Sequence, residues 1–202
     1  MITLYHAPQS RSARPKWLLE EAGATYDVVR VDLSKQEHKS AEHLRRHPHG
    51  QVPVLVDGDL ALIESAAICL HLADRFPHAK LAPALGSPER GRYYQWMVYA
   101  IATLEAPIVD IFMNTVQLPE AQRSAEKVAA ARTQFAAIGR VLSDALGAHP
   151  YLLGADFSAA DIMVGSTLAW GSFMGLLDDS PVLAAYVERL TQRPAFQRAQ
   201  AD

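Results

Sequence analysis

The stretch Gly50-Gln51-Val52-Pro53-Val54-Leu55-Val56-Asp57-Gly58-Asp59-Leu60-Ala61-Leu62-Ile63-Glu64-Ser65 decides the fold of the first part of the chain. Its two apolar runs flank Asp57-Gly58, a pair that favours an antiparallel hairpin because glycine adopts the positive φ of a tight turn. Pro53 cannot donate a ladder hydrogen bond, so it belongs at the first residue of a strand, where a cis Val52-Pro53 bond could also turn the chain. A helix with a polar start is predicted from Glu64-Ser65 onward.

The residues before the hairpin predict alternating strands and helices. Residues 2–6 form a β-rich run, and a helix then runs from a serine cap to Gly23, which is a typical C-terminal stop. A second strand over residues 26–31 completes a βαβ unit, and a helix over residues 37–46 leads to the hairpin. The predicted order βαβαββα is that of a thioredoxin-like α/β domain.

The residues after the hairpin predict a second, all-helical domain. Residues 76–88 are rich in proline and glycine and have no clear period, which indicates a linker. We therefore expect a thioredoxin-like domain over residues 1–77, a linker over 78–88 and a helical domain over 89–202. The helices expected in it cover residues 89–109, the segment from Pro119 to Gly147, residues 162–177, and two further segments that start at Ser180-Pro181 and Arg193-Pro194.

Composition excludes several classes of protein. The chain has 202 residues, 50% of them hydrophobic and 20% charged, which is ordinary for a globular protein with a substantial core. The net charge is −3 and the basic residues are dispersed, so the sequence has no basic patch of the kind that binds nucleic acid. No signal peptide is apparent, and the longest uncharged run, residues 162–177, is short for a membrane span. We expect a cytoplasmic protein that binds neither nucleic acid nor membrane.

The V-P segment, the hairpin and the E-S pair together resemble the glutathione-binding half of the thioredoxin-like domain in cytosolic glutathione transferases. The resemblance implies a cis Val52-Pro53 peptide whose backbone pairs with the cysteinyl part of glutathione. It also implies that Glu64 and Ser65 hold the γ-glutamyl carboxylate and amine. A plain hairpin followed by a capped helix is the structural alternative for the same residues.

The second half of the chain strengthens the resemblance. Gly154, Phe157, the capping box Ser158–Asp161 and the segment Arg193–Phe196 are similar to the helical domain of these transferases, so the likeness covers nearly the whole chain. It points to a bacterial, serine-type or theta-like class. It implies a homodimer, with the helix after Glu64 and the first long helix of the second domain at the interface. The capping box is structural, and we assign it no catalytic role.

A transferase of this kind must present glutathione as a thiolate, so a hydroxyl donor aimed at the sulfur is expected. Ser10, between the first strand and the first helix, is placed for that role, and Ser12 is the alternative donor. In serine-type classes the activating serine follows a Pro-Gly pair, whereas this chain has Pro8-Gln9. In classes with a cysteine in this loop, that cysteine would fall at Arg11. Both serines are also natural helix caps, and a backbone N–H is a further possible donor.

Two further groups of residues follow from the resemblance. His38 and Gln51 are expected to bind the glycyl carboxylate of glutathione, with Lys39 as a second choice and a solvated helix start as the structural alternative. An apolar pocket for the electrophile is expected from a set of residues that could equally belong to the core of the helical domain: Tyr93, Trp96, Met97, Tyr99, Phe112 and Met113.

Neither a metal nor a resident cofactor is expected. Four histidines lie close together at His38, His43, His47 and His49, but no H-E-x-x-H pattern and no nearby cysteine accompany them. Cys69 is the single cysteine and is predicted to be an inert buried thiol. Glutathione would be a co-substrate.

The resemblance therefore implies a glutathione transferase that conjugates the thiolate of bound glutathione to a small hydrophobic electrophile. A glutathione-dependent disulfide or peroxide reductase on the same fold is the main alternative, and a ring-opening isomerase or a dehalogenase is a weaker one. The absence of a C-x-x-C motif argues against dithiol redox chemistry. The remaining alternative is a non-catalytic protein that binds hydrophobic ligands or a partner.

Overall fold

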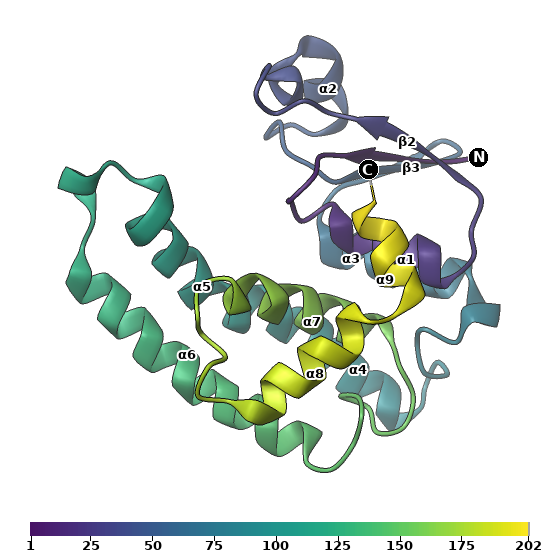
Figure 1. Ribbon diagram of the computed structural model, residues 1–202. Helices are drawn as coiled ribbons and strands as arrows, with labels where there is room; N and C mark the ends of the chain where they lie inside the picture. The colour runs from purple at the N-terminus through teal and green to yellow at the C-terminus, as the bar shows by residue number, and fades with distance from the viewer. Residues whose placement is uncertain (202) are drawn as a thin grey trace. The chain divides into compact units, whose positions relative to one another are not determined.

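The computed structural model describes residues 1–201, which form two compact units. The first unit comprises Met1–Ala82 and the C-terminal stretch that begins at Gln192, and the second comprises Pro83–Thr191. The first unit is built on a four-stranded sheet, and the second, here called the helical unit, is built from helices (Figure 1). The predicted thioredoxin-like domain and all-helical domain are thus confirmed.

The sheet of the first unit has the strand order β2-β1-β3-β4. β1 runs parallel to β2 and antiparallel to β3, and β3 runs antiparallel to β4. Gly58 has a φ of 62° in the predicted hairpin turn between β3 and β4. The elements of this unit are β1 (Ile2–His6), α1 (Ala13–Glu21), β2 (Tyr26–Arg30), a 3₁₀ turn (Glu37–Lys39), α2 (Ala41–Arg46), β3 (Val54–Asp57), β4 (Leu60–Leu62), α3 (Ser65–Arg75), a second 3₁₀ turn (Pro77–Ala79) and α9 (Pro194–Gln200).

The core of the first unit lies between the sheet and helices α1 and α3. Leu4 on β1 and Leu55 on β3 have no exposed surface, and neither do Ile68 and Leu72 on α3. Side chains alternate along β1 between the buried and the half-exposed face, as the period of a strand requires. Burying each aliphatic side chain contributes roughly 1.5–3 kcal/mol before the loss of chain entropy is subtracted.

Helix α9 packs against α1 in the first unit, although the sequence placed it with the helical domain. Trp17 of α1 makes an edge-to-face contact with Phe196 of α9, with ring centroids 4.9 Å apart. Glu21 accepts two hydrogen bonds from the guanidinium of Arg193, at 2.6 and 2.8 Å, and Glu20 accepts one from Arg198 at 2.7 Å. The two helices lie side by side in Figure 1. An aromatic contact and two ion pairs therefore explain why the expected domain boundary does not hold at the C-terminus.

The helical unit surrounds the strongly apolar helix α7. α7 buries ten of its fourteen residues, and α4, α5 and α8 pack against it. Helix α6 packs its apolar face, which includes Phe135, Ile138 and Leu142, mainly against α5. The helices are α4 (Pro88–Tyr99), α5 (Glu105–Phe112), α6 (Ala125–Leu146), α7 (Ala159–Ser172) and α8 (Pro181–Thr191).

Two π-helical segments join onto α5 and extend the first long helix beyond its predicted end near Val109. They cover Ala100–Leu104 and Met113–Gln117, so the helical run extends from Pro88 to Gln117. Pro107 lies inside this run. Proline has no N–H to donate, and in a regular α-helix its ring clashes with the carbonyl group four residues earlier. The preceding π segment shifts the hydrogen bonding, since the Glu105 N–H donates to the carbonyl of Ala100. This wider turn accounts for how the helix passes Pro107.

Three other predicted boundaries can be compared with the structure. The capping box at the start of α7 is confirmed, because the Asp161 carboxylate accepts the N–H of Ser158 at 2.9 Å. Pro119 does not open α6: Ser124 caps that helix by accepting the N–H of Lys127 at 3.2 Å. The apolar segment predicted to reach Leu177 leaves the helix after Ser172, since a glycine with a φ of 66° follows at Gly175.

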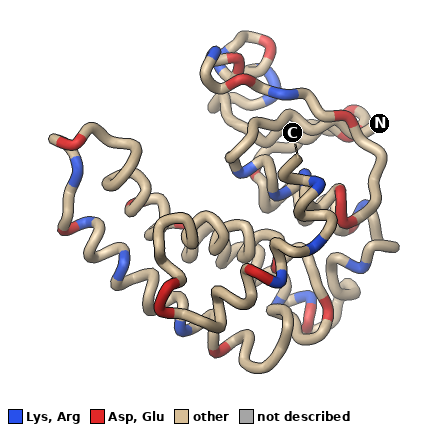
Figure 2. The backbone as a smooth tube through the Cα atoms, viewed as in Figure 1, with Lys and Arg blue, Asp and Glu red and all other residues tan. Residues whose placement is uncertain are grey.

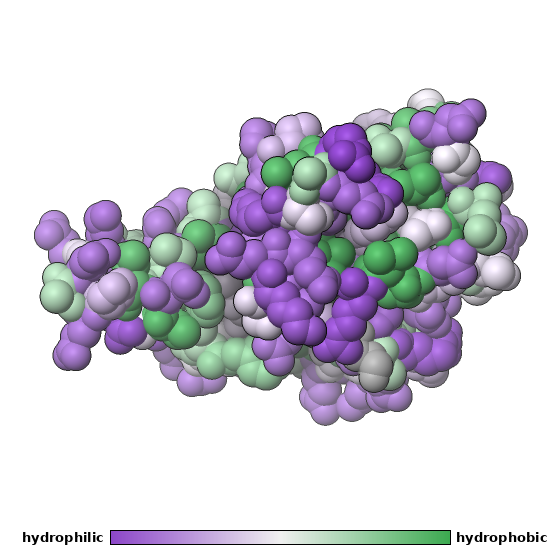
Figure 3. Space-filling model, turned by 90° about the horizontal axis from the view of Figure 1, so that it is seen from above, coloured by the Kyte–Doolittle hydropathy of each residue, from purple (hydrophilic) through white to green (hydrophobic). Residues whose placement is uncertain are grey.

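Charged residues of both signs are spread along the chain (Figure 2), and one face of the protein is mostly polar (Figure 3). Basic and acidic residues are interspersed along the chain in Figure 2, and hydrophilic residues cover most of the face shown in Figure 3, with hydrophobic residues in small groups. The run Pro88–Gln117 has the length and, with a mean hydropathy of 1.5 in its most apolar window, the composition of a membrane-spanning helix. Of that window, 44% is buried inside the protein, and a single helix of this kind is weak evidence for a membrane span.

Candidate active site

Several of the predicted site residues meet at one edge of the sheet in the first unit. β1 ends at His6, and its neighbour β3 begins at the same edge, because Tyr5 lies opposite Val54 in an antiparallel pair. β4 returns to this edge, with Leu62 opposite Leu55, and α3 starts directly after it. The loop with Ser10, the Val52-Pro53 peptide and the Glu64-Ser65 pair therefore lie close together, although they are far apart in sequence.

The loop between β1 and α1 keeps a left-handed turn without the glycine that the resemblance led us to expect. Gln9 has a φ of 54°, which non-glycine residues adopt at a modest cost. This turn is followed by Ser10, whose side chain is partly exposed, whereas Arg11 is exposed and Ser12 has no exposed surface. Of the two candidate serines, Ser10 is the one that a ligand can reach.

The two serines form a hydrogen-bonded cluster with His6. The Oγ atoms of Ser10 and Ser12 are 2.6 Å apart, and Ser12 Oγ lies 2.7 Å from Nδ1 of His6. Both hydroxyls also lie within hydrogen-bond distance of the Ala7 carbonyl oxygen, at 2.7 Å for Ser10 and 3.0 Å for Ser12. Ser12 occupies the N-cap position of α1 but its side chain makes no cap hydrogen bond, so simple capping does not explain it.

Sequence reasoning did not single out His6 as part of this cluster. Its side chain is only 3% exposed, and it follows Ile2 and Leu4 on the inward face of β1. A histidine at an inward position at the end of a strand, next to a serine-rich loop, is the signal that could have identified it. The hydrogen bond to Ser12 depends on the path of the loop and could not be predicted.

The peptide between Val52 and Pro53 is cis, as the resemblance implies. Pro53 is buried and Val52 is half-buried. The paired part of β3 begins at Val54, so Val52 lies outside the ladder with β1. Gln51 is exposed next to it, and its carbonyl oxygen lies 2.8 Å from Nε2 of His43.

The start of α3 brings Glu64 and Ser65 to the same edge. Glu64 is exposed and has a φ of 71°, which turns the chain into the helix and leaves Ser65 as its first residue. Ser65 is buried, and its hydroxyl accepts a hydrogen bond of 3.2 Å from the guanidinium of Arg14. Arg14 itself is only 4% exposed. A buried cation therefore supports the N-terminus of α3, where the free N–H groups of the first turn favour an anion.

The remaining predicted ligands of glutathione lie in the segment between β2 and β3. Lys39 donates hydrogen bonds to the carbonyl oxygens of His49 and Gly50, at 3.0 and 3.1 Å. Gly50 lies so close to the backbone of His38 that a Cβ atom would come within 2.6 Å of the His38 carbonyl oxygen. Nδ1 of His38 is buried without a hydrogen-bond partner among the described residues. These contacts hold His38 and Lys39 beside the residues that precede Gln51.

Histidines of the segment 38–49 contact one another. The rings of His43 and His47 are stacked with their centroids 6.5 Å apart, and His47 is 3% exposed. Burial lowers the pKa of His47, and the neighbouring His43 and His49 lower it further. Among residues 1–201 no three histidine, cysteine or acidic side chains are grouped so that they could hold a metal ion. Burial also raises the pKa of the fully buried Cys69 to about 12, which makes it a poor nucleophile at neutral pH.

The residues proposed for the electrophile pocket differ in their burial. Tyr93 and Met97 have no exposed surface and Trp96 is 6% exposed, which is typical of core residues. Tyr99, Phe112 and Met113 are half-buried, and Phe112 contacts Trp170 edge-to-face with centroids 5.5 Å apart. These three are the members of the set that keep part of their surface exposed.

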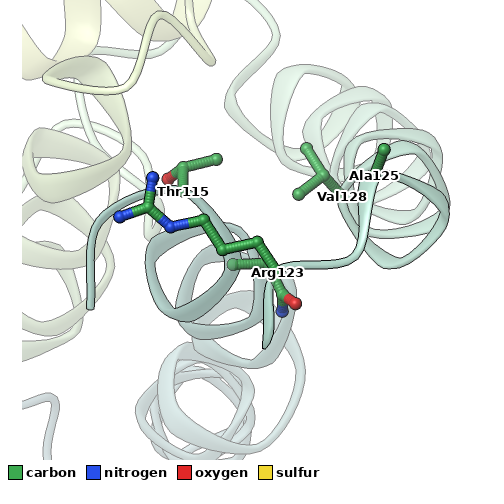
Figure 4. Close-up of a pocket in the computed structure, with 5 residues that line it drawn as sticks. Thr115, Arg123, Ala125 and Val128 are labelled. Carbon is green, nitrogen blue, oxygen red and sulfur yellow. The ribbon is translucent and has the colours of Figure 1, made fainter. Parts of the chain in front are cut away.

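Two open cavities in the helical unit are lined by other residues. The first lies between the end of the first long helical run and the start of α6, where Arg123 extends toward Thr115 opposite Ala125 and Val128 (Figure 4). Arg123 uses its side chain locally, since it donates to the carbonyl oxygens of Leu118 and Val116 at 2.8 and 3.1 Å. The second cavity lies between the end of α7 and α8. Neither contains a residue that the sequence predicted for the site.

Comparison with known proteins identifies the family of this chain. Residues 1–74 match the family model of the glutathione S-transferase N-terminal domain, and residues 125–189 match that of the C-terminal domain. The chain is 32% identical to the probable glutathione S-transferase GSTF1 of Oryza sativa subsp. japonica, over 96% of this chain and 93% of that protein.

Two solved bacterial structures are similar over almost the whole chain. A sphingomonad glutathione S-transferase solved in complex with glutathione is 32% identical, with a TM-score of 0.84 over 98% of this chain and 96% of that one. The bacterial transferase BphK, solved as a ternary complex, is 34% identical, with a TM-score of 0.84 over 98% and 97% of the two chains. The chain described here therefore belongs to the glutathione S-transferase family.

Proposed function

We propose that the protein binds glutathione at this edge of the sheet and transfers its thiolate to a small hydrophobic electrophile. The observation that carries the proposal is the position of Ser10. Ser10 is partly exposed, its hydroxyl forms a hydrogen bond with buried Ser12, and it lies at the same edge as the cis peptide and the start of α3. No metal and no resident cofactor are needed for this chemistry.

Ser10 would act by donating a hydrogen bond to the sulfur. A free thiol has a pKa of about 8.5, so only a few per cent is ionised at neutral pH. A hydrogen bond to a charged group contributes about 1.5–3 kcal/mol, and one pKa unit corresponds to about 1.4 kcal/mol. One donor would thus lower the thiol pKa by roughly one to two units, which makes thiolate a major species near pH 7. Proximity of the electrophile supplies the remaining rate enhancement.

The two ends of glutathione would be held by the residues on either side of Ser10. Glu64 would pair with the γ-glutamyl amine, and Ser65 with the N-terminus of α3 would bind the neighbouring carboxylate. The hydrogen bond from Arg14 orients Ser65 for this contact. Val52 would offer its backbone to the cysteinyl unit. His38, Lys39 and Gln51 are the candidates for the glycyl carboxylate.

Two alternatives lead to different measurements. A glutathione-dependent disulfide or peroxide reductase would turn over disulfides or hydroperoxides faster than aryl halides. Such a reductase could not rely on the single cysteine of this chain, because Cys69 is fully buried and its thiol is held protonated. A non-catalytic binding protein would bind glutathione or hydrophobic ligands without turnover.

Oligomeric state and location form part of the proposal. Tyr94, Val98 and Ile101 are exposed along one side of the first long helical run, at the spacing of one helix face. A homodimer that covers this face would remove apolar surface from water. Sedimentation of the purified chain tests this directly. We propose a cytoplasmic location, where glutathione is abundant and a single free thiol stays reduced.

The decisive experiment is a titration of the thiolate absorbance of bound glutathione against pH, in the wild type and in Ser10→Ala. We expect the bound thiol to ionise well below pH 8.5 in the wild type and the substitution to raise its pKa by one to two units. Ser143→Ala, a half-buried serine on α6, is the matched control and should change nothing. Absence of glutathione binding would leave the fold without this function. An unshifted thiol would mean that Ser10 is not the donor.

A further inference from the structure

His6 is a buried group that the proposed reaction does not yet use. It is 3% exposed and Ser12 is 0% exposed, so neither can touch a ligand, but both connect to Ser10 through short hydrogen bonds. A buried histidine at the end of a chain of hydroxyls can decide in which direction the protons of that chain point.

Each hydroxyl of the cluster has a single proton to donate. Ser12 Oγ accepts the N–H of Ala7 at 3.1 Å and faces three possible acceptors for its own proton: His6 Nδ1, Ser10 Oγ and the Ala7 carbonyl. Ser10 Oγ accepts the N–H of Ser12 at 3.2 Å and also lies 2.7 Å from the Ala7 carbonyl. The contact of 2.6 Å between the two hydroxyls requires that one of them donates to the other.

The direction of that contact depends on His6. If Nδ1 accepts a proton from Ser12, then Ser10 must donate to Ser12, and no hydroxyl proton is left for a sulfur atom. If Nδ1 carries a proton and donates it to Ser12, then Ser12 can donate to Ser10, and the proton of Ser10 is free to leave the Ala7 carbonyl. Hydrogen bonds arranged in one direction along a chain also strengthen one another.

We propose that His6 is a positioning residue that donates its Nδ1 proton to Ser12 and so directs the hydroxyl proton of Ser10 toward the sulfur of glutathione. The inference rests on the proposed function, because it assumes that Ser10 is the donor to the thiolate. It adds that the donor strength of Ser10 is set from within the first unit, by a side chain that never contacts the substrate.

Two variants of His6 test the direction of the chain. His6→Leu removes the donor, whereas His6→Asn keeps an N–H close to the position of Nδ1. We expect His6→Leu to raise the pKa of the bound thiol by about one unit, the size of one hydrogen bond to a charged group. His6→Asn should restore most of the difference. The dissociation constant for glutathione should change less than about twofold in both, since His6 does not touch the ligand.

The pH profile separates positioning from a general structural defect. With His6→Leu, kcat/KM should fall about fivefold at pH 7, because raising the thiol pKa from about 7 to about 8 lowers the thiolate fraction from about one half to about one tenth. The loss should disappear at a pH above the raised pKa, where the thiol ionises without help. A variant that is merely misfolded would lose activity at every pH, and circular dichroism of both variants would show this.

A measurement on the wild type keeps the inference testable even if both variants fail to fold. Heteronuclear NMR of the imidazole nitrogens, with His6 assigned through the backbone, reports which ring nitrogen carries the proton. A protonated Nδ1 is the expected result. An unprotonated Nδ1 would mean that Ser12 donates to His6, and it would overturn the inference.

Ser10→Ala, measured in the same series, distinguishes a failure of the proposed donor role of Ser10 from a failure of the proposed role of His6. If Ser10→Ala leaves the thiol pKa unchanged, the donor assignment fails and the role of His6 fails with it. If Ser10→Ala raises the pKa while His6→Leu leaves it unchanged or lowers it, Ser10 remains the donor and only the role of His6 is overturned.

Discussion

Two buried polar clusters lie at the starts of α1 and α7, and they are built in different ways. At α7, the N–H groups of Leu152 and Ser158 and the hydroxyls of Ser158 and Tyr186 all donate to Asp161, at 2.8 to 3.0 Å. Each donor has one acceptor, so a single arrangement satisfies the cluster. At α1, the hydroxyls of Ser10 and Ser12 share several acceptors, so more than one arrangement is possible.

This difference separates a cluster that stabilises the fold, at α7, from a cluster that keeps a donor available for a ligand, at α1. Four donors on one buried carboxylate offset its desolvation, although burial still raises the pKa of Asp161 above its usual range. Such a cluster has nothing left to offer a ligand. The cluster at α1 has a partly exposed hydroxyl whose proton can be directed elsewhere at little cost, which is what a site for a thiolate requires.

The largest expected effect comes from breaking the cluster at α7. Asp161→Asn replaces one acceptor oxygen with an NH₂ group and leaves buried donors unpaired, so we expect a loss of about 3–5 kcal/mol in the free energy of unfolding. Urea denaturation measures it. Asp156→Asn, at an exposed position in the preceding loop, is the control and should stay within about 0.5 kcal/mol. A loss below about 1 kcal/mol for Asp161→Asn would contradict this account of the cluster.

Breaking the cluster at α1 should reduce activity strongly and stability only slightly. Ser10→Ala should lower kcat/KM for conjugation by roughly ten- to a hundredfold, since it removes one hydrogen bond to a charged group. The free energy of unfolding should change by less than about 1 kcal/mol, because Ser10 is partly exposed. Steady-state kinetics and urea denaturation on the same preparation check both. Unchanged activity with reduced stability would show that Ser10 only stabilises the loop before α1.

A third buried polar group, His47, should make the stability of the fold depend on pH. Its Nδ1 has no partner among the described residues, and burial lowers its pKa. A histidine held neutral in the folded state contributes stability above its unfolded pKa of about 6.5, and this contribution is lost as the pH falls below that value toward the folded pKa.

The variant His47→Gln tests this dependence. The wild type should lose stability between neutral pH and mildly acidic pH more steeply than the variant, while at neutral pH the substitution itself should cost less than about 2 kcal/mol. Thermal unfolding across that pH range is the measurement. His149→Gln, at an exposed position in the helical unit, should keep the wild-type slope. Equal slopes for His47→Gln and the wild type would place the acid sensitivity elsewhere.

The smallest effect is expected at the surface. The hydrogen bond from His71, together with Arg75, lowers the pKa of Asp57 at the end of β3. The stability from these pairs is present above the unfolded pKa of Asp, about 4, and is lost as the pH falls through the folded pKa. Asp57→Asn should cost about 0.5 kcal/mol in low salt and less in high salt, measured by urea denaturation. A cost that is independent of salt would indicate a packing effect.

Much of the first unit could be predicted because its signals are local. The Asp57-Gly58 turn, the proline at the entrance of β3 and the glycine after α1 each act on the backbone within a few residues, and all three are found where expected. The same holds for the capping box from Ser158 to Asp161. The resemblance then pointed to Ser10, Val52, Pro53, Glu64 and Ser65 as candidate site residues, and the strand pairing brings these positions to one edge.

Features that depend on distant contacts were decided by the tertiary structure. The sequence by itself determined the βαβαββα order, the helical second half and the family, because propensity, turn chemistry and motifs are read over short stretches. The docking of α9 on α1 required an ion pair between residues 172 positions apart, Glu21 and Arg193. The orientation of Ser65 by Arg14 and of Ser12 by His6 likewise depends on which buried polar groups meet once the chain has folded. Buried polar groups must find partners, and only the packed structure decides which partners they find.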